Sequence, residues 1–164
     1  MSGDIATLRR RLDQVLELVE REIDHLLAVH SRFFDQIDSG PVSVDWLQEK
    51  LDTPEGIDQL ESFGSKFSRT QDTVMDKLLP TWLASQGERL GTVIDNLNRA
   101  ERLGLISETD IWLEMRRLRN ELVHEYQPDP EKMAYSLERA RDLTSELCKT
   151  TEKIKQRTNN TKTN

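Results

Sequence analysis

The spacing of apolar residues near the start of the chain constrains the fold more than any other feature. Between Asp4 and about Phe34, apolar side chains recur every three or four positions, at Ile5, Leu8, Leu12, Val15, Val19, Ile23, Leu26 and Phe33. This period matches the 3.6-residue turn of an α-helix and places the apolar groups along one narrow stripe. The stretch therefore predicts one long amphipathic helix with Asp4 as its N-cap.

The same period returns along the rest of the chain. We predict further helices over residues 44–51, 54–85, 93–103, 107–126 and 130–156. Thr53 and Pro54 form a typical helix start, and Ser107 and Asp129 are the predicted caps of the last two helices. Pro80 lacks a backbone donor and should kink the helix that contains it.

No segment shows the two-residue alternation of a β-strand, and no internal repeat or linker divides the chain. The sequence therefore predicts an all-α fold, an antiparallel bundle of five or six helices in one domain over residues 1–156. The remaining residues, 157–164, are polar and predict a disordered tail. Trp46, Trp82 and Trp112 each lie in an apolar stripe and are interpreted as core anchors.

Charge and composition exclude several function classes. The chain has 23 Lys and Arg against 30 Asp and Glu, a net charge of −7, which argues against broad adhesion to nucleic acid or anionic membranes but leaves room for a local basic site. A single cysteine, Cys148, no long apolar run and no signal-peptide pattern predict a cytoplasmic protein without membrane association. His25 and His30 have no ligand spacing around them, so we expect no metal site and no cofactor.

The distinctive chemistry is concentrated between residues 116 and 126. Ile111, Met115, Leu118 and Leu122 mark the core side of this helix. At 100° per residue, Arg117, Asn120 and His124 share a second face, while Arg119 and Tyr126 line up on an adjoining one. A guanidinium, an amide, an imidazole and a phenol are therefore predicted to gather at the C-terminal end of a helix.

These groups suit phosphate chemistry. An arginine fork matches phosphate oxygens, and a histidine transfers protons near neutral pH. Alternatively, these residues have a purely structural role at the end of the helix, where Glu121 and Glu125 neutralise the arginines and the histidine. Ser65, Lys66, Arg69 and Gln71, which interrupt the stripe of the 54–85 helix, are either a solvated face or a polar wall opposite the motif helix.

The segment Arg119–Tyr126 resembles the R-x4-H-x-Y signature of the HEPN superfamily, and specifically its HepT-like toxin branch. The resemblance implies that Arg119 and His124 are the catalytic pair of a metal-independent endoribonuclease, with Asn120 orienting one of them. It implies that Tyr126 is modified with AMP by a partner nucleotidyltransferase antitoxin. It also implies a homodimer whose motif helices meet, which would bring Arg116, Arg117 and Arg119 of both copies together on an RNA substrate.

Three functions remain open from the sequence. The first is a toxin ribonuclease that cuts RNA by attack of a 2′-hydroxyl on the adjacent phosphodiester. The second is a non-catalytic module that binds a nucleotide or a nucleotidyltransferase. The third is a structural or regulatory interaction protein, in which the motif is a salt-bridged helix end.

Overall fold

The computed structural model describes residues 2–123 and 129–163 and is helical almost throughout. Its elements are α1 (Ser2–Phe33), α2 (Val44–Leu51), α3 (Pro54–Thr73), the π-helical turn η1 (Val74–Leu78), α4 (Leu79–Ser85), α5 (Val93–Arg102), α6 (Thr109–Val123) and α7 (Pro130–Thr163). The described part of the chain contains no strand, which confirms the predicted all-α class. None of its helices combines the length and the apolar character needed to cross a membrane.

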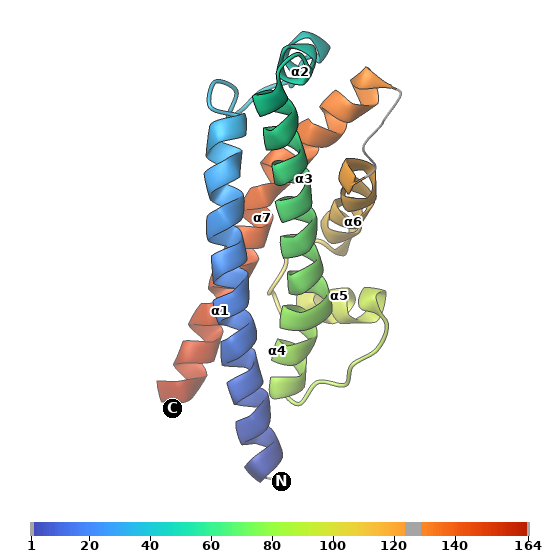
Figure 1. Ribbon diagram of the computed structural model, residues 1–164. Helices are drawn as coiled ribbons and strands as arrows, with labels where there is room; N and C mark the ends of the chain where they lie inside the picture. The colour runs from blue at the N-terminus through green and yellow to red at the C-terminus, as the bar shows by residue number, and fades with distance from the viewer. Residues whose placement is uncertain (1, 124–128, 164) are drawn as a thin grey trace.

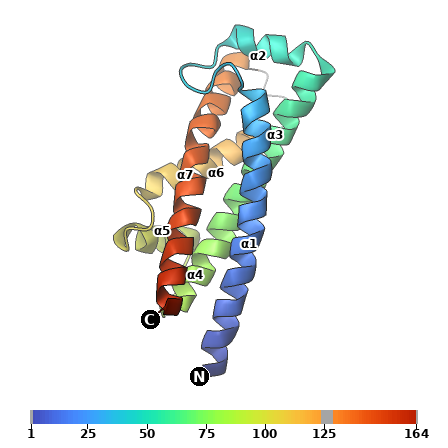
Figure 2. The same cartoon turned by 90° about the vertical axis from the view of Figure 1, so that its left-hand side faces the viewer.

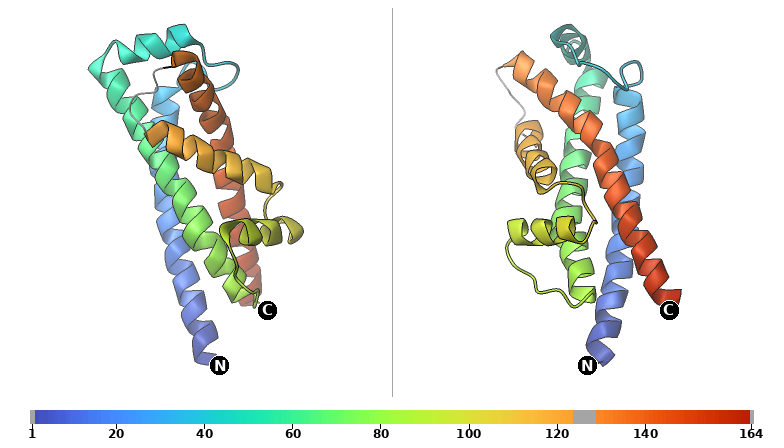
Figure 3. Two further views of the ribbon diagram at one scale, coloured as in Figure 1. Left: turned by 90° about the vertical axis from the view of Figure 1, so that its right-hand side faces the viewer. Right: turned by 180° about the vertical axis from the view of Figure 1, so that it is seen from behind.

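Three long rods form the body of the bundle (Figure 1). α3, η1 and α4 follow one another without a break, so they make one rod that runs antiparallel to α1. α7 also runs antiparallel to α1 and lies along it in the turned view (Figure 2). The shorter α5 and α6 pack across these rods, and α6 crosses α3 (Figure 3). The predicted antiparallel bundle is thus confirmed, with α3 and α7 pointing the same way.

The core contains most of the predicted apolar stripe of α1. The stripe is buried from Leu12 to Phe33 except for the partly buried Val15, whereas Ile5 is exposed because the first turns extend past the other helices. Trp112 and Trp82 are buried, as predicted, and Trp46 packs partly buried against the core. Near the α2 end, the rings of Phe33, Phe34, Phe63 and Trp46 pack with centroids 4.7 to 6.0 Å apart. Aromatic contacts of this kind stabilise beyond the area that they bury.

Side-chain caps set most helix starts. The hydroxyl of Thr53 accepts a hydrogen bond from the Gly56 amide at 3.0 Å, which confirms the predicted start of α3. Asp129 caps α7 in the same way. Two predicted caps are wrong. α1 already begins at Ser2, and α6 begins at Thr109 rather than beside Ser107.

Pro80 follows a widened turn. The amide of Leu79 bonds to the carbonyl of Val74, five residues back, and η1 ends at Leu78, two residues before the proline. A proline ring would collide with the carbonyl four residues before it, and the wider π turn removes that collision. The helix therefore continues through Pro80 into α4 instead of ending there.

The predicted disordered tail is helical over residues 157–163, so this prediction is wrong. Arg157 donates to the carbonyls of Leu103 and Gly104 at 2.8 and 3.2 Å, and Lys162 pairs with Asp13 at 2.7 Å. These contacts fix the polar residues against other parts of the bundle, and composition alone does not predict such contacts.

One buried cation holds the connection between α1 and α2. The Arg141 side chain of α7 donates to the carbonyls of Ile37 (2.9 Å) and Gly40. One turn earlier, the carboxylate of Glu138 accepts from the Val42 amide at 2.8 Å. Arg141 is only 3% exposed, so its guanidinium is shielded from water and depends on protein acceptors such as these carbonyls. The connection is therefore fixed by α7, about a hundred residues later.

We predict that Arg141→Met lowers the free energy of unfolding by about 2–4 kcal/mol, because two carbonyl groups lose their donors. Urea denaturation followed by circular dichroism measures this. The exposed Arg32→Met on α1 removes the same charge and should change stability by no more than about 0.5 kcal/mol. Equal effects of the two substitutions would show that Arg141 does not hold the connection.

Candidate functional site

The end of α6 rests on the middle of α3 at a glycine. A Cβ atom on Gly64 would lie 3.1 Å from the carbonyl oxygen of Leu122, closer than such contacts usually are. The missing side chain at residue 64 therefore lets the two helices approach closely. This approach places the arginines of α6 opposite the polar side of α3.

Arg119 is tied to α3 and to its own neighbour. Its Nε atom lies 2.8 Å from both carboxylate oxygens of Asp72, and its Nη1 donates to the amide oxygen of Asn120 at 3.1 Å. The side chains of Arg119 and Asp72 are 38% and 31% exposed, so solvent still reaches the pair. Two of the predicted catalytic residues, Arg119 and Asn120, are thus in direct contact at an open position.

The other two arginines of the motif differ from each other. Arg116 donates to Asp76 at 3.0 Å and lies 3.9 Å from Asp72, while its covered Nε has no partner. Arg117 is exposed and forms no ion pair within the described residues. The predicted phosphate-binding pair is therefore divided, with Arg116 facing α3 and Arg117 facing solvent.

His124 and Tyr126, the remaining predicted site residues, lie outside the described residues, as does Glu125. The structure thus provides the position of Arg119 and Asn120 within this motif. Their helix reaches Val123, which leads directly into the rest of the signature.

Glu121 does not neutralise these arginines, contrary to one alternative. It accepts a hydrogen bond from Ser136 of α7 and lies 3.8 Å from Lys132. Glu114, two turns earlier, forms a two-point pair with Arg139 of α7 at 2.8 and 2.9 Å, and this bond holds its pKa below the usual range. Glu114 and Glu121 therefore join α6 to α7, and Arg116 and Arg119 join it to α3.

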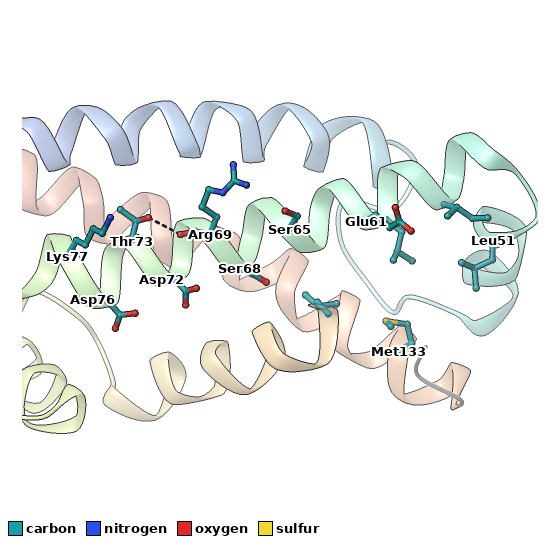
Figure 4. A pocket seen from close by; sticks show the side chains of 13 residues that line it. Leu51, Glu61, Ser65, Ser68, Arg69, Asp72, Thr73, Asp76, Lys77 and Met133 are labelled. Atoms are coloured by element: carbon teal, nitrogen blue, oxygen red, sulfur yellow. Dashed lines mark hydrogen bonds between the residues drawn. The ribbon is translucent and has the colours of Figure 1, made fainter. Parts of the chain in front are cut away.

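A groove runs along α3 beside this cluster (Figure 4). It has a volume of about 690 Å³. Its apolar end is formed by Leu51, Ile57, Leu60, Leu122 and Met133, and its polar end by Glu61, Ser65, Ser68, Arg69, Asp72, Thr73, Asp76 and Lys77. Such a mixture of apolar floor and polar edge is typical of ligand sites.

The predicted polar wall is present but differs in composition. Ser65 and Arg69 line the groove, whereas Gln71 is buried and Lys66 bonds to Ser62 within its own helix. The residues that face α6 are Asp72 and Asp76, which sequence reasoning missed. Asp72 and Asp76 are four residues apart and Arg116 and Arg119 are three apart, so each pair lies on one face of its helix. This matching spacing was the sequence signal that could have identified the two aspartates.

Beside the polar end of the groove, α1 carries a partly buried carboxylate. Glu22 accepts from the hydroxyl of Thr73 at 3.1 Å, but its second oxygen is covered and has no partner. Burial raises the pKa of Glu22. The hydrogen bond from Thr73 and the positive charges of Arg69 and Lys77 lower this pKa, but they offset the effect of burial only in part. The charged form of Glu22 is thus unfavourable in the folded protein.

We predict a pH-dependent stability difference between the natural protein and Glu22→Gln. The folded pKa of Glu22 lies above the ordinary 4.5, so the folded state resists ionisation more than the unfolded chain does. The stability of the natural protein relative to the variant should therefore fall as pH rises through and above this value. Urea denaturation at pH 4 and pH 7 measures the difference. An equal stability difference between the natural protein and Glu22→Gln at the two pH values would contradict the assignment.

His30 has a structural environment. Its Nε2 lies 3.2 Å from the carbonyl oxygen of Arg141, and its ring packs edge-on against Phe34 and Phe63. Among the described residues, no group of three or more His, Cys, Asp or Glu is arranged to hold a metal ion.

Comparison of the chain with protein-family models, with curated proteins and with solved structures found no match. A function for this protein must therefore follow from the chemistry of its own side chains.

Proposed function

We propose that the protein is a HepT-like toxin, an endoribonuclease that needs no metal ion and uses Arg119 and His124 as its catalytic pair. The observation that supports this most is the contact between Arg119 and Asn120 at the open end of α6, beside the groove along α3. A half-exposed guanidinium held by an amide is suited to bind a phosphate from solution.

The proposed reaction is a transesterification. The 2′-oxygen of a ribose attacks the adjacent phosphorus, the bond to the 5′-oxygen of the next nucleotide breaks, and a 2′,3′-cyclic phosphate remains. His124 transfers the proton from the attacking hydroxyl or to the leaving oxygen. Arg119 stabilises the charge that develops on the phosphoryl oxygens, and Asn120 orients the guanidinium.

Asp72 has a defined part in this proposal. It holds the Arg119 guanidinium through Nε at 2.8 Å, while Nη1 is held by Asn120. A phosphate that binds Arg119 must therefore compete with a carboxylate for the same cation. Asp72 thereby positions the arginine in the free protein and also weakens its attraction for RNA.

The proposed partners follow from the same motif. A nucleotidyltransferase antitoxin would modify Tyr126 with AMP, which adds bulk and negative charge beside the catalytic pair. A homodimer through the motif helices would place two copies of Arg117 near the substrate. Since Arg116 and Arg119 are paired with acids of α3, the exposed Arg117 contributes most of the free positive charge that α6 offers to RNA.

A second candidate is a non-catalytic module that binds a nucleotide or a nucleotidyltransferase. The ion pairs of Arg116 and Arg119 with α3 favour it, because they give both arginines a structural task. A purely structural or regulatory interaction protein would use the same pairs. Catalysis separates these candidates from the ribonuclease.

The deciding experiment is cleavage of a generic RNA by the purified protein in excess chelator. We expect the natural protein to cut, His124→Ala to lose about 100-fold to 10,000-fold in rate, and Arg119→Ala about 100-fold to 1000-fold. The exposed Arg32→Ala should cut normally. Cleavage that persists in both motif variants would exclude this site. Absence of cleavage by folded protein with unmodified Tyr126 would favour the binding module.

We further predict that Asp72→Asn increases RNA affinity by a factor of about 1.4 to 5, the change expected when one exposed ion-pair partner of about 0.2–1 kcal/mol is removed. Fluorescence anisotropy of a labelled RNA with His124→Ala as background measures binding without cleavage. Asp58→Asn, also on α3 and exposed, removes the same charge away from Arg119 and serves as the matched control. Equal gains in both variants would indicate a general charge effect only.

A further inference from the structure

Three arginines surround a second hollow, at the opposite end of α6 from Arg119. Arg89 comes from the segment that precedes α5, and Arg99 and Arg102 come from the last turns of α5. The hollow has a volume of about 570 Å³ and is also lined by Leu90, Gly91, Asp95 and Asn98. Nothing in the proposed ribonuclease mechanism uses these residues.

The backbone around this hollow is tightly organised. Thr92 and Asp95 form a reciprocal capping box, with bonds of 3.0 and 3.2 Å between amides and side chains. The Gly91 amide donates to the Asn96 side chain at 3.0 Å, and a Cβ on Gly91 would lie 2.7 Å from the Asp95 carboxylate. The segment that carries Arg89 is thus fastened to the start of α5.

Among the described residues, the structure records no hydrogen bond between these arginines and the acids near them. The carboxylate of Asp95 serves the capping box, and that of Glu101 accepts from the Thr109 hydroxyl at 3.1 Å. Glu88 lies 3.9 Å from Arg99 Nη1, too far for a hydrogen bond, and this covered nitrogen has no acceptor. Arg99 and Arg102 are also three residues apart on one helix, where like charges repel. The cluster therefore has one covered donor without a partner, and its three arginines face two nearby acids, Asp95 and Glu88.

We propose that Arg89, Arg99 and Arg102 bind a phosphate group. Guanidinium forks match phosphate oxygens, and an anion between them would relieve both the repulsion and the unused donor. Leu90 and Leu103 are 47% and 39% exposed beside the cluster and offer apolar surface to the rest of the ligand. The phosphate belongs either to a free nucleotide or to an RNA chain.

The site is separate from Arg119. Thr109, which bonds to Asn98 and Glu101 of α5, lies ten residues before Arg119 on α6. At 1.5 Å per residue this is about 15 Å along the helix axis. Binding at α5 is therefore a property that holds whether or not Arg119 takes part in RNA cleavage.

The test is calorimetric titration of the full chain with inorganic pyrophosphate in chelator. The double variant Arg99→Gln/Arg102→Gln should bind about tenfold more weakly or worse, because charge-assisted hydrogen bonds are lost. Arg21→Gln/Arg32→Gln removes the same charge from the exposed side of α1 and should bind normally. If the double variant does not fold, Arg89→Gln in the exposed segment replaces it, with a weakening of at least about threefold expected.

Three results would overturn the proposal: no binding at millimolar pyrophosphate, equal weakening in the α1 control, or loss of binding in Arg119→Gln instead. Titrations with AMP and with a short single-stranded RNA then show whether the bound phosphate belongs to a free nucleotide or to an RNA chain. A nucleotide site binds AMP about as tightly as the RNA. An RNA-backbone site binds the RNA more tightly, and its salt dependence becomes shallower in the Arg99→Gln/Arg102→Gln variant.

Discussion

The close approach of α6 to α3 at Gly64 is the constraint on which the candidate site depends. A side chain at that position would meet the Leu122 carbonyl, and the C-terminal half of α6 would have to move outward. The distances of 2.8 Å from Arg119 to Asp72 and 3.0 Å from Arg116 to Asp76 require the two helices to be this near. The ion pairs of the site therefore depend on the absence of a side chain at Gly64.

α6 is a helix with two different polar partners. Two of its acids, Glu114 and Glu121, bond to α7, and two of its arginines, Arg116 and Arg119, bond to α3. The charged side chains of α6 thus serve mainly to hold the helix in place. Apart from a few arginines, the protein remains acidic. An active site of this kind would act on phosphate through one or two well-placed guanidinium groups rather than through a broad basic surface.

Much of the fold was predictable because local signals are strong in helices. The apolar period along α1 and the cap at Thr53 were both correctly interpreted from the sequence, whereas the π turn before Pro80 was not predicted. The polar tail was not, since residues such as Arg157 are ordered by carbonyls of Leu103 and Gly104, which are distant in sequence. For the same reason one partner of Arg119, Asp72, was missed. Asp72 lies 47 positions earlier, and only the packing of α3 on α6 brings the two together.

The clamp between Arg141 and the segment after α1 has a consequence for how the protein is made. Residues 37 and 40 leave the ribosome about a hundred residues before Arg141, so they wait for their donors during synthesis. During that interval the side of α1 that later meets α7 is uncovered, and contacts of such long range are also slow to form. The connection between α1 and α2 thus lacks its α7 donors until the last fifth of the chain has been made.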